Sequence, residues 1–141
     1  TLHRYSNVQV AVAAPGTAGF APADASAPAV AAYYWWVFPN LMVNAYPWGI
    51  SFNLVEPQAP DRTRVAFRSY VWDASKLDTG AGAGLDAVEL EDEAIVEAVH
   101  RGVRSRLYRG GRYSPVRERC VHQFHRLLCE FLREPGTPDS P

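Results

Sequence analysis

The first half of the chain consists of short apolar or alternating runs, a pattern typical of β-strands. These runs occupy residues 5–13, 30–38, 41–46, 50–55 and 63–72. Residues that favour turns separate them, namely Pro39-Asn40, Tyr46-Pro47-Trp48-Gly49 and the segment 56–62. Segment 14–28 is rich in Ala, Pro and Gly and predicts a surface loop. The pattern therefore predicts strands in an antiparallel series.

The second half has helical periodicity. One helix is expected over about 86–108, acidic in its first half and basic in its second, which complements the helix dipole. Ser114 and Pro115 are residue types of an N-cap and a first helical position, so they predict the start of a second helix. Its apolar stripe is Cys120, Val121, Phe124, Leu127, Leu128 and Phe131. The Pro-rich tail, 134–141, is expected to be disordered.

Strands followed by helices predict an α+β fold, a curved antiparallel sheet with long C-terminal helices packed on it. With 141 residues and 48% apolar residues, the chain can build one hydrophobic core. The sequence opens at Thr1 without a methionine. We therefore expect it to be part of a longer protein, with residues 1–133 forming part of one domain.

Composition excludes several functional classes. The net charge of −1 gives no general attraction to nucleic acid or anionic lipid, and no apolar run has the length of a membrane span. Cys120 and Cys129 lie in one predicted helix, where they cannot easily bond to each other, so we expect a reducing cytoplasm. The segment 79–84, TGAGAG, lacks the Lys-Ser/Thr ending of a phosphate-binding loop.

The apolar stripe of the first helix contains one charged residue, Asp92, whose position the helical pattern does not explain. On a helical wheel it falls among apolar residues, which are Val88, Ile95, Val96, Val99, Val103 and Leu107. A carboxylate that faces a core is costly unless a cation or hydrogen-bond donors meet it. Two interpretations stay open: Asp92 caps backbone or pairs with an arginine, or it is a metal ligand or catalytic acid.

The remaining polar clusters favour ordinary roles. His122 and His125 project away from the apolar stripe of the second helix and are expected to be partly exposed. The arginines from Arg101 to Arg119 have the composition of a phosphate or RNA contact, but the acidic half-helix beside them favours a solvated, ion-paired face. We therefore expect no nucleic-acid partner.

Six segments occur in an order and spacing that resemble a known family. They are Phe38-Pro39-Asn40-Leu41-Met42, Tyr46-Pro47-Trp48-Gly49, 60–65 (PDRTRV), 91–97 (EDEAIVE), Gly111-Arg112-Tyr113-Ser114 and 121–126 (VHQFHR). From about Val30 to Leu132 the chain resembles the C-terminal part of the α-subunit of Rieske-type ring-hydroxylating oxygenases. The resemblance implies a helix-grip (START-like) catalytic domain, of which residues 1–133 would be the C-terminal part.

The same resemblance implies a function and a site. Such enzymes hydroxylate an aromatic or related small organic substrate with O2, at a mononuclear Fe(II) held by two histidines and one carboxylate. Asp92 falls on the carboxylate ligand. Asn40, Met42 and Val88 are candidate residues of the substrate pocket, with a purely structural turn as the alternative for Asn40. A reductase or ferredoxin would supply electrons, a homotrimer is usual, and aromatic catabolism is the expected setting.

The chain departs from the family pattern in two respects. It offers no upstream pair of histidines with the family's His-x4-His-like spacing, since the only N-terminal histidine is His3. It also has no Cys-His pattern for a Rieske 2Fe-2S cluster, which we expect only in a preceding part of the protein. We therefore expect the chain alone to be inactive. The alternative is a non-enzymatic START-like module that binds an apolar small molecule. Such a module should tolerate Asp92→Asn and gain stability from Asp92→Leu, whereas a metal site should lose iron with either.

Overall fold

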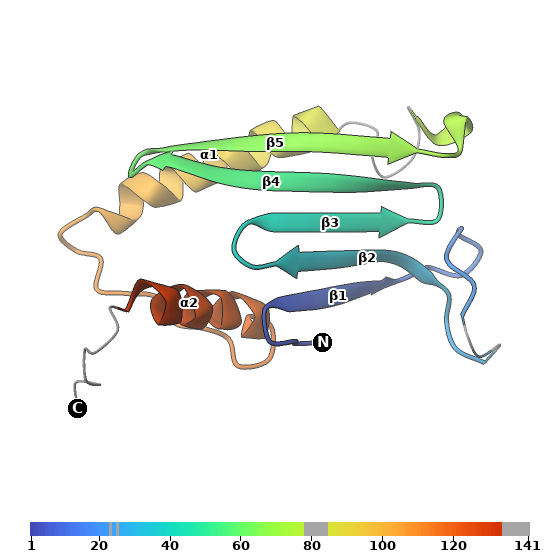
Figure 1. Cartoon of the computed structure of the whole chain (residues 1–141), viewed down its shortest axis with the longest axis horizontal. Helices are drawn as coiled ribbons and strands as arrows, with labels where there is room; N and C mark the ends of the chain where they lie inside the picture. The colour runs from blue at the N-terminus through green and yellow to red at the C-terminus, as the bar shows by residue number, and fades with distance from the viewer. Residues whose placement is uncertain (23, 25, 78–84, 134–141) are drawn as a thin grey trace.

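The predicted antiparallel sheet is present. The computed structural model describes the chain except residues 23, 25, 78–84 and 134–141, and except the side chains of 85–89. One five-stranded antiparallel sheet has its strands in chain order, β1 to β5 (Figure 1). The strands are β1 (Ser6–Val12), β2 (Val30–Val37), β3 (Leu41–Tyr46), β4 (Gly49–Ala59) and β5 (Arg62–Val71). With two helices after the strands, the α+β fold class is confirmed. The TGAGAG segment and the predicted disordered tail lie outside the described residues.

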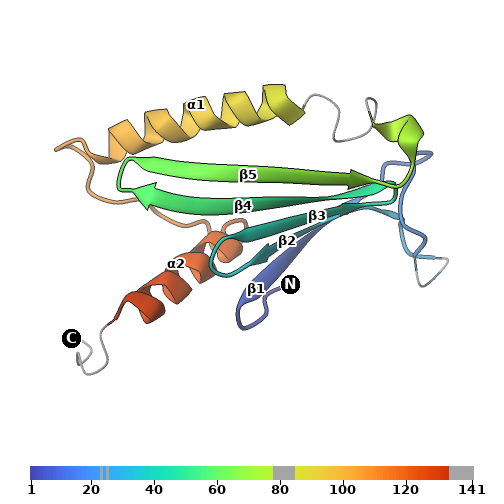
Figure 2. The ribbon, with the colours of Figure 1, turned by 45° about the horizontal axis from the view of Figure 1, so that its top comes forward.

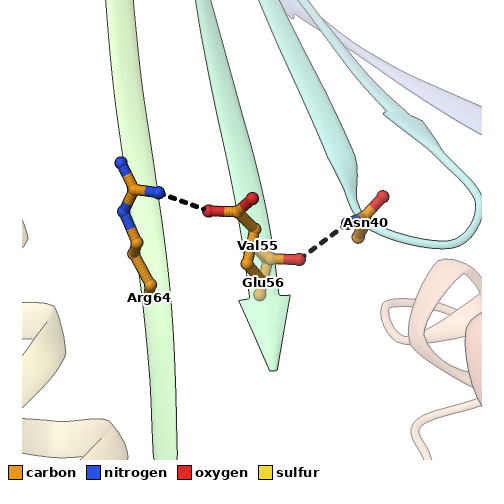
Figure 3. Close-up of polar contacts among 4 residues, drawn as sticks. All are labelled: Asn40, Val55, Glu56 and Arg64. Carbon is orange, nitrogen blue, oxygen red and sulfur yellow. Dashed lines mark hydrogen bonds and ion pairs between the residues drawn. The ribbon is translucent and has the colours of Figure 1, made fainter. Parts of the chain in front are cut away.

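The β4–β5 hairpin is longer than the sequence pattern predicted. A loop was expected over 56–62, but the strands continue to Ala59 and turn at Pro60-Asp61. Glu56 and Arg64 are direct cross-strand partners, and their side chains pair at 3.2 Å (Figure 3). A cross-strand charge pair stabilises the pairing of the two strands. The strand pairing accommodates Pro57 because its register shifts between Pro57 and Ala59.

Both helices differ from their predicted bounds. α1 runs from Leu85 to Val103 and gives way to turns, rather than continuing to Tyr108. Gly102 lies at this end, and the Ser105 amide donates to the Gly102 carbonyl at 3.0 Å. Because glycine is a poor helix former, it favours such an ending. Ser114 does cap a turn, through the Arg117 amide at 3.2 Å, but α2 itself runs from Arg119 to Leu132.

Helix α2 lies on one face of the sheet. Phe124 contacts Trp36 of β2 edge-to-face, with ring centroids 5.1 Å apart. Phe131 packs against Phe38 with centroids 4.8 Å apart. Leu127, on the same stripe, is buried. Part of the predicted apolar stripe, namely Phe124, Leu127 and Phe131, therefore holds α2 beside the sheet, whereas Val121 and Leu128 of the same stripe stay exposed.

Helix α1 leaves its apolar stripe uncovered. In both views it follows the line of β4 and β5 (Figures 1 and 2), yet Ile95, Val96 and Val99 are each more than half exposed. The accessible surface is 11186 Å², whereas a compact monomer of this mass exposes about 7,200 Å². Apolar surface that a compact domain would bury is therefore open to solvent. Among the described helices, none is both long and apolar enough to cross a membrane.

Candidate substrate and metal site

The register of the sheet defines a face that is both polar and aromatic. Residues directly opposite one another in a ladder point to the same side. Trp36, Met42 and Asn53 are successive partners across β2, β3 and β4, and so are Tyr34, Asn44 and Ser51. Because Trp36 contacts α2, we call this side the α2 face.

Polar side chains in the middle of the α2 face are bonded to one another. Asn44 Nδ2 donates to Ser51 Oγ at 3.1 Å, and Ser51 is 7% exposed. At the α2 end, Asn7 Nδ2 donates to Gln123 Oε1 at 3.2 Å. Buried polar groups need such partners, and satisfied networks fix side-chain positions. This face can therefore present defined hydrogen-bonding groups to a ligand.

Three aromatic side chains meet at one part of the α2 face. Tyr34 and Tyr46 are in edge contact with centroids 6.2 Å apart, and Tyr46 stacks on Trp48 at 4.9 Å. We call these three residues the aromatic corner. Burial, together with the neighbouring Tyr34, raises the pKa of Tyr46 to about 12. The corner is therefore uncharged at neutral pH, and aromatic faces of this kind attract cations.

Sequence reasoning missed the aromatic corner. Tyr34 and Trp48 are fourteen residues apart in the chain, and only the pairing of β2 with β3 brings them to one place. Part of the aromatic corner could have been predicted from the strand at 30–38, because side chains alternate along a strand and Tyr34 and Trp36 therefore share one face.

The structure gives the predicted pocket residues different surroundings. Asn40 Nδ2 donates to the Val55 carbonyl at 2.8 Å, and the Val55 amide donates to the Asn40 carbonyl at 2.9 Å (Figure 3). The structural role of Asn40 is thus observed, and its pocket role stays a prediction. Met42 is half-buried on the α2 face. Val88 belongs to α1, but its side chain lies outside the described residues.

Asp92 is exposed on α1 rather than buried. Within the described part of the chain it makes no hydrogen bond or ion pair, whereas Glu97 and Arg101 on the same helix pair at 3.8 Å. The expectation that a protein group satisfies Asp92 is therefore wrong for this structure. The reason is that the apolar stripe around it is itself uncovered, so water solvates the carboxylate.

The described residues do not form an iron site by themselves. No three His, Cys, Asp or Glu side chains among them come close enough to hold a metal ion. His122 and His125 instead flank the Tyr113 ring, with centroids 5.1 and 5.6 Å away. His125 Nδ1 and the Tyr113 hydroxyl are hydrogen-bonded. A single exposed carboxylate does not fit the two-histidine, one-carboxylate set.

Comparison with known protein families shows which family this chain belongs to. The family model described as "Ring hydroxylating alpha subunit (catalytic domain)" matches residues 11–134. The chain belongs to this ring hydroxylating alpha subunit family. The match covers all five strands in whole or part and both helices, so the resemblance noted from the six short segments is confirmed.

Curated relatives of this ring hydroxylating alpha subunit chain are plant choline monooxygenases, named as chloroplastic. The Arabidopsis thaliana protein is 41% identical over 108 residues, which are 72% of this chain and 25% of that protein. The Atriplex hortensis protein is 32% identical over 108 residues, with 72% and 24% covered. The Spinacia oleracea protein is 29% identical over 110 residues, with 74% and 25% covered. The chain spans about a quarter of the length of these relatives. No solved structure matches it significantly.

Proposed function

We propose that this chain forms the C-terminal part of the catalytic domain of a Rieske-type oxygenase with a mononuclear non-heme iron. The whole enzyme would hydroxylate a small organic substrate with O2. The observation that carries the proposal is the match of the catalytic-domain family over residues 11–134. The α2 face supports it, because a half-open sheet face with bonded polar groups and aromatic side chains suits a small-molecule site.

We propose a choline-type quaternary ammonium alcohol as the substrate class, in place of the aromatic ring expected from the sequence. The relatives are named choline monooxygenases. The aromatic corner supports this choice, because quaternary ammonium groups are bound over the faces of Trp and Tyr rings. Tyr46 and Trp48 would contact the cation, and the Asn44–Ser51 pair lies on the same face to bond a hydroxyl group.

Asp92 is the one iron ligand that we propose for this chain. An Fe(II) centre with open coordination positions would supply the O2 chemistry when bound. Since the described residues offer no second and third ligand, both histidines would come from outside them. Folding of the complete domain would then cover the stripe around Asp92 and bring the carboxylate to the metal.

The partners of the whole enzyme are part of the same proposal. They are O2, a reductase or ferredoxin that feeds a Rieske 2Fe-2S cluster outside this chain, and further copies of the subunit in a homotrimer. Both cysteines are free thiols, which suits a reducing compartment. That fits the cytoplasm expected from the sequence and equally the compartment named for the plant relatives.

A START-like binding module remains the second candidate. The observation that favours it is that the α2 face carries bonded polar groups beside stacked aromatic side chains, which suit a binding module as well as an enzyme. Because Asp92 is exposed here, Asp92→Leu buries no new apolar group within this chain and should not stabilise it. The two candidates are therefore separated by catalysis rather than by stability.

A chimera tests the proposed function. In the Arabidopsis choline monooxygenase, the quarter of the protein that matches this chain is replaced by the matching residues of this chain. We expect the chimera to oxidise choline with a reductase present, and Asp92→Ala to abolish this activity while Glu91→Gln retains it. A folded chimera that binds choline but never oxidises it would favour the binding module.

The isolated chain is the complementary control. We expect the purified 141-residue chain, supplied with Fe(II) and a reductase, to produce no hydroxylated product because its ligand set is incomplete. Product formation by the isolated chain would contradict this.

A further inference from the structure

A cleft lies between the N-terminal segment and α2, away from the aromatic corner. Its volume is about 460 Å³, within the range of small-molecule sites. The segment from Leu2 to Tyr5 forms one wall, and α2 residues from Arg119 to Glu130 form the other. Figure 1 shows the N-terminus and α2 at the same end of β1. Nothing in the proposed oxygenase function uses this cleft.

The side-chain amide of Gln123 links the two walls of the cleft by hydrogen bonds. Its Nε2 donates to the carbonyl groups of His3 and Ser6, the latter at 3.4 Å. Its Oε1 accepts from Asn7 Nδ2 at 3.2 Å, and Asn7 is 4% exposed. A half-buried amide that uses both ends in this way fixes residues that lie far apart in the sequence. The cleft is therefore a built feature of the fold and not a gap between loose segments.

The cleft is basic although the chain as a whole is not. Three arginines and one carboxylate line it, Arg4, Arg119, Arg126 and Glu130, which leaves two excess positive charges against a net charge of −1 for the chain. Glu130 is already paired with Arg126 at 3.2 Å. Arg4 stacks over the Tyr5 ring at 4.9 Å. Within the described part of the chain, neither Arg4 nor Arg119 forms an ion pair, so both guanidinium groups can bind a ligand.

We propose that this cleft binds a phosphate group, either free or as a small phosphomonoester. The planar fork of a guanidinium donates two parallel hydrogen bonds to an oxyanion, and two such forks on opposite walls suit a doubly charged group. Arg4 approaches from the N-terminal wall and Arg119 from the first residue of α2. A ligand at this place would bridge the N-terminal segment and α2.

Isothermal titration calorimetry of the 141-residue chain tests the proposal. Inorganic phosphate is titrated in low-salt buffer, and phenyl phosphate in a second series distinguishes a free phosphate site from one that prefers an ester. We expect saturable one-site binding, weakened about tenfold or more by the double change Arg4→Gln and Arg119→Gln, because each lost charged hydrogen bond matters this much. Arg104→Gln, outside the cleft, is the matched control and should bind like the unchanged chain.

Two results would overturn the phosphate site. One is the absence of saturable binding in the unchanged chain, and the other is equal affinity in the double variant and in Arg104→Gln. If circular dichroism shows that the double variant has lost its fold, Arg119→Lys takes its place. This change keeps the charge but removes the fork, so we expect several-fold weaker binding, and unchanged binding would count against the proposal.

Discussion

Single residues on the α2 face have roles set by their immediate partners. The Asn40 amide holds the start of β3 to Val55 near the end of β4. Asn44 and Ser51 bond to each other across the same two strands. Tyr46 lies between two aromatic neighbours, which exclude water from its hydroxyl more than from an exposed tyrosine. These contacts lead to two predictions.

The raised pKa of Tyr46 predicts a loss of stability in alkali. A pKa of about 12 in the folded chain lies above the ordinary value of 10.0. The stabilisation is therefore fully present below pH 10 and is lost as the pH rises toward 12. We expect the free energy of unfolding in urea to fall between pH 10 and pH 12, and to fall less in Tyr46→Phe. Tyr70→Phe, exposed on the opposite face, is the control, and an identical fall in all three proteins would contradict the assignment.

The aromatic corner predicts where the cation binds. In the active chimera, Trp48→Ala should raise KM for choline about threefold to thirtyfold, because a cation–π contact contributes roughly 0.5–2 kcal/mol. Trp48→Phe should restore part of the affinity. Tyr70→Ala provides a control, since Tyr70 is exposed on the opposite face of the sheet. A larger KM effect for Tyr70→Ala than for Trp48→Ala would contradict the assignment.

At the scale of elements, packing distinguishes the two helices. α2 is fixed by aromatic contacts with β2 and by the Gln123 amide. α1 has regular helical geometry and an i,i+4 ion pair, but its apolar residues are exposed. Isolated helices depend on tertiary packing of their apolar face for most of their stability. α1 is therefore the element that most needs a covering surface.

Removal of one aromatic contact should loosen α2. We expect Phe124→Ala to lower the free energy of unfolding by about 2 kcal/mol, less than for a fully buried phenylalanine because Phe124 is half-buried. Urea denaturation followed by tryptophan fluorescence measures this. Val116→Ala, at a site that is 82% exposed, should change stability by less than about 0.5 kcal/mol. Equal effects of the two changes would contradict the packing described for α2.

The sequence pattern predicted the helices and strands better than it predicted the burial and the tertiary contacts of their residues. Alternation and turn residues were sufficient to predict that each of the five strands exists, because these signals are local. They did not predict the full length of β4. The start of α2 was placed too early since Ser114 and Pro115 form a real capped turn that does not continue as helix. Asp92 was identified from periodicity, but its exposure was not, because burial depends on a partner surface. The aromatic corner required strand register, which a hydrophobic pattern does not contain.

The whole molecule has the layout of an incomplete domain. Among the described residues, Ala32 and Leu127 are the buried hydrophobic side chains, and the accessible surface is well above that of a compact monomer of this mass. The matched residues cover only 25% of the Arabidopsis thaliana relative. Family membership and exposed surface are thus both consistent with a chain that forms part of a larger catalytic domain.

The exposed stripe of α1 should bind an apolar dye. Large contiguous apolar patches on a soluble chain mark surfaces that are covered in use. We expect the isolated chain to enhance the fluorescence of anilinonaphthalene sulfonate, and the double change Ile95→Lys and Val99→Lys to reduce this enhancement by about half or more. Val116→Lys, exposed but outside α1, should leave it unchanged. Loss of the signal in Val116→Lys alone would place the dye elsewhere.

The central claim is that this chain contributes Asp92 to an oxygenase iron site, and the iron content of the purified chimera tests it most directly. After anaerobic reconstitution with Fe(II), we expect near-stoichiometric mononuclear iron in the chimera and in Glu91→Gln, and little in Asp92→Ala. Full retention of iron by Asp92→Ala would contradict the claim.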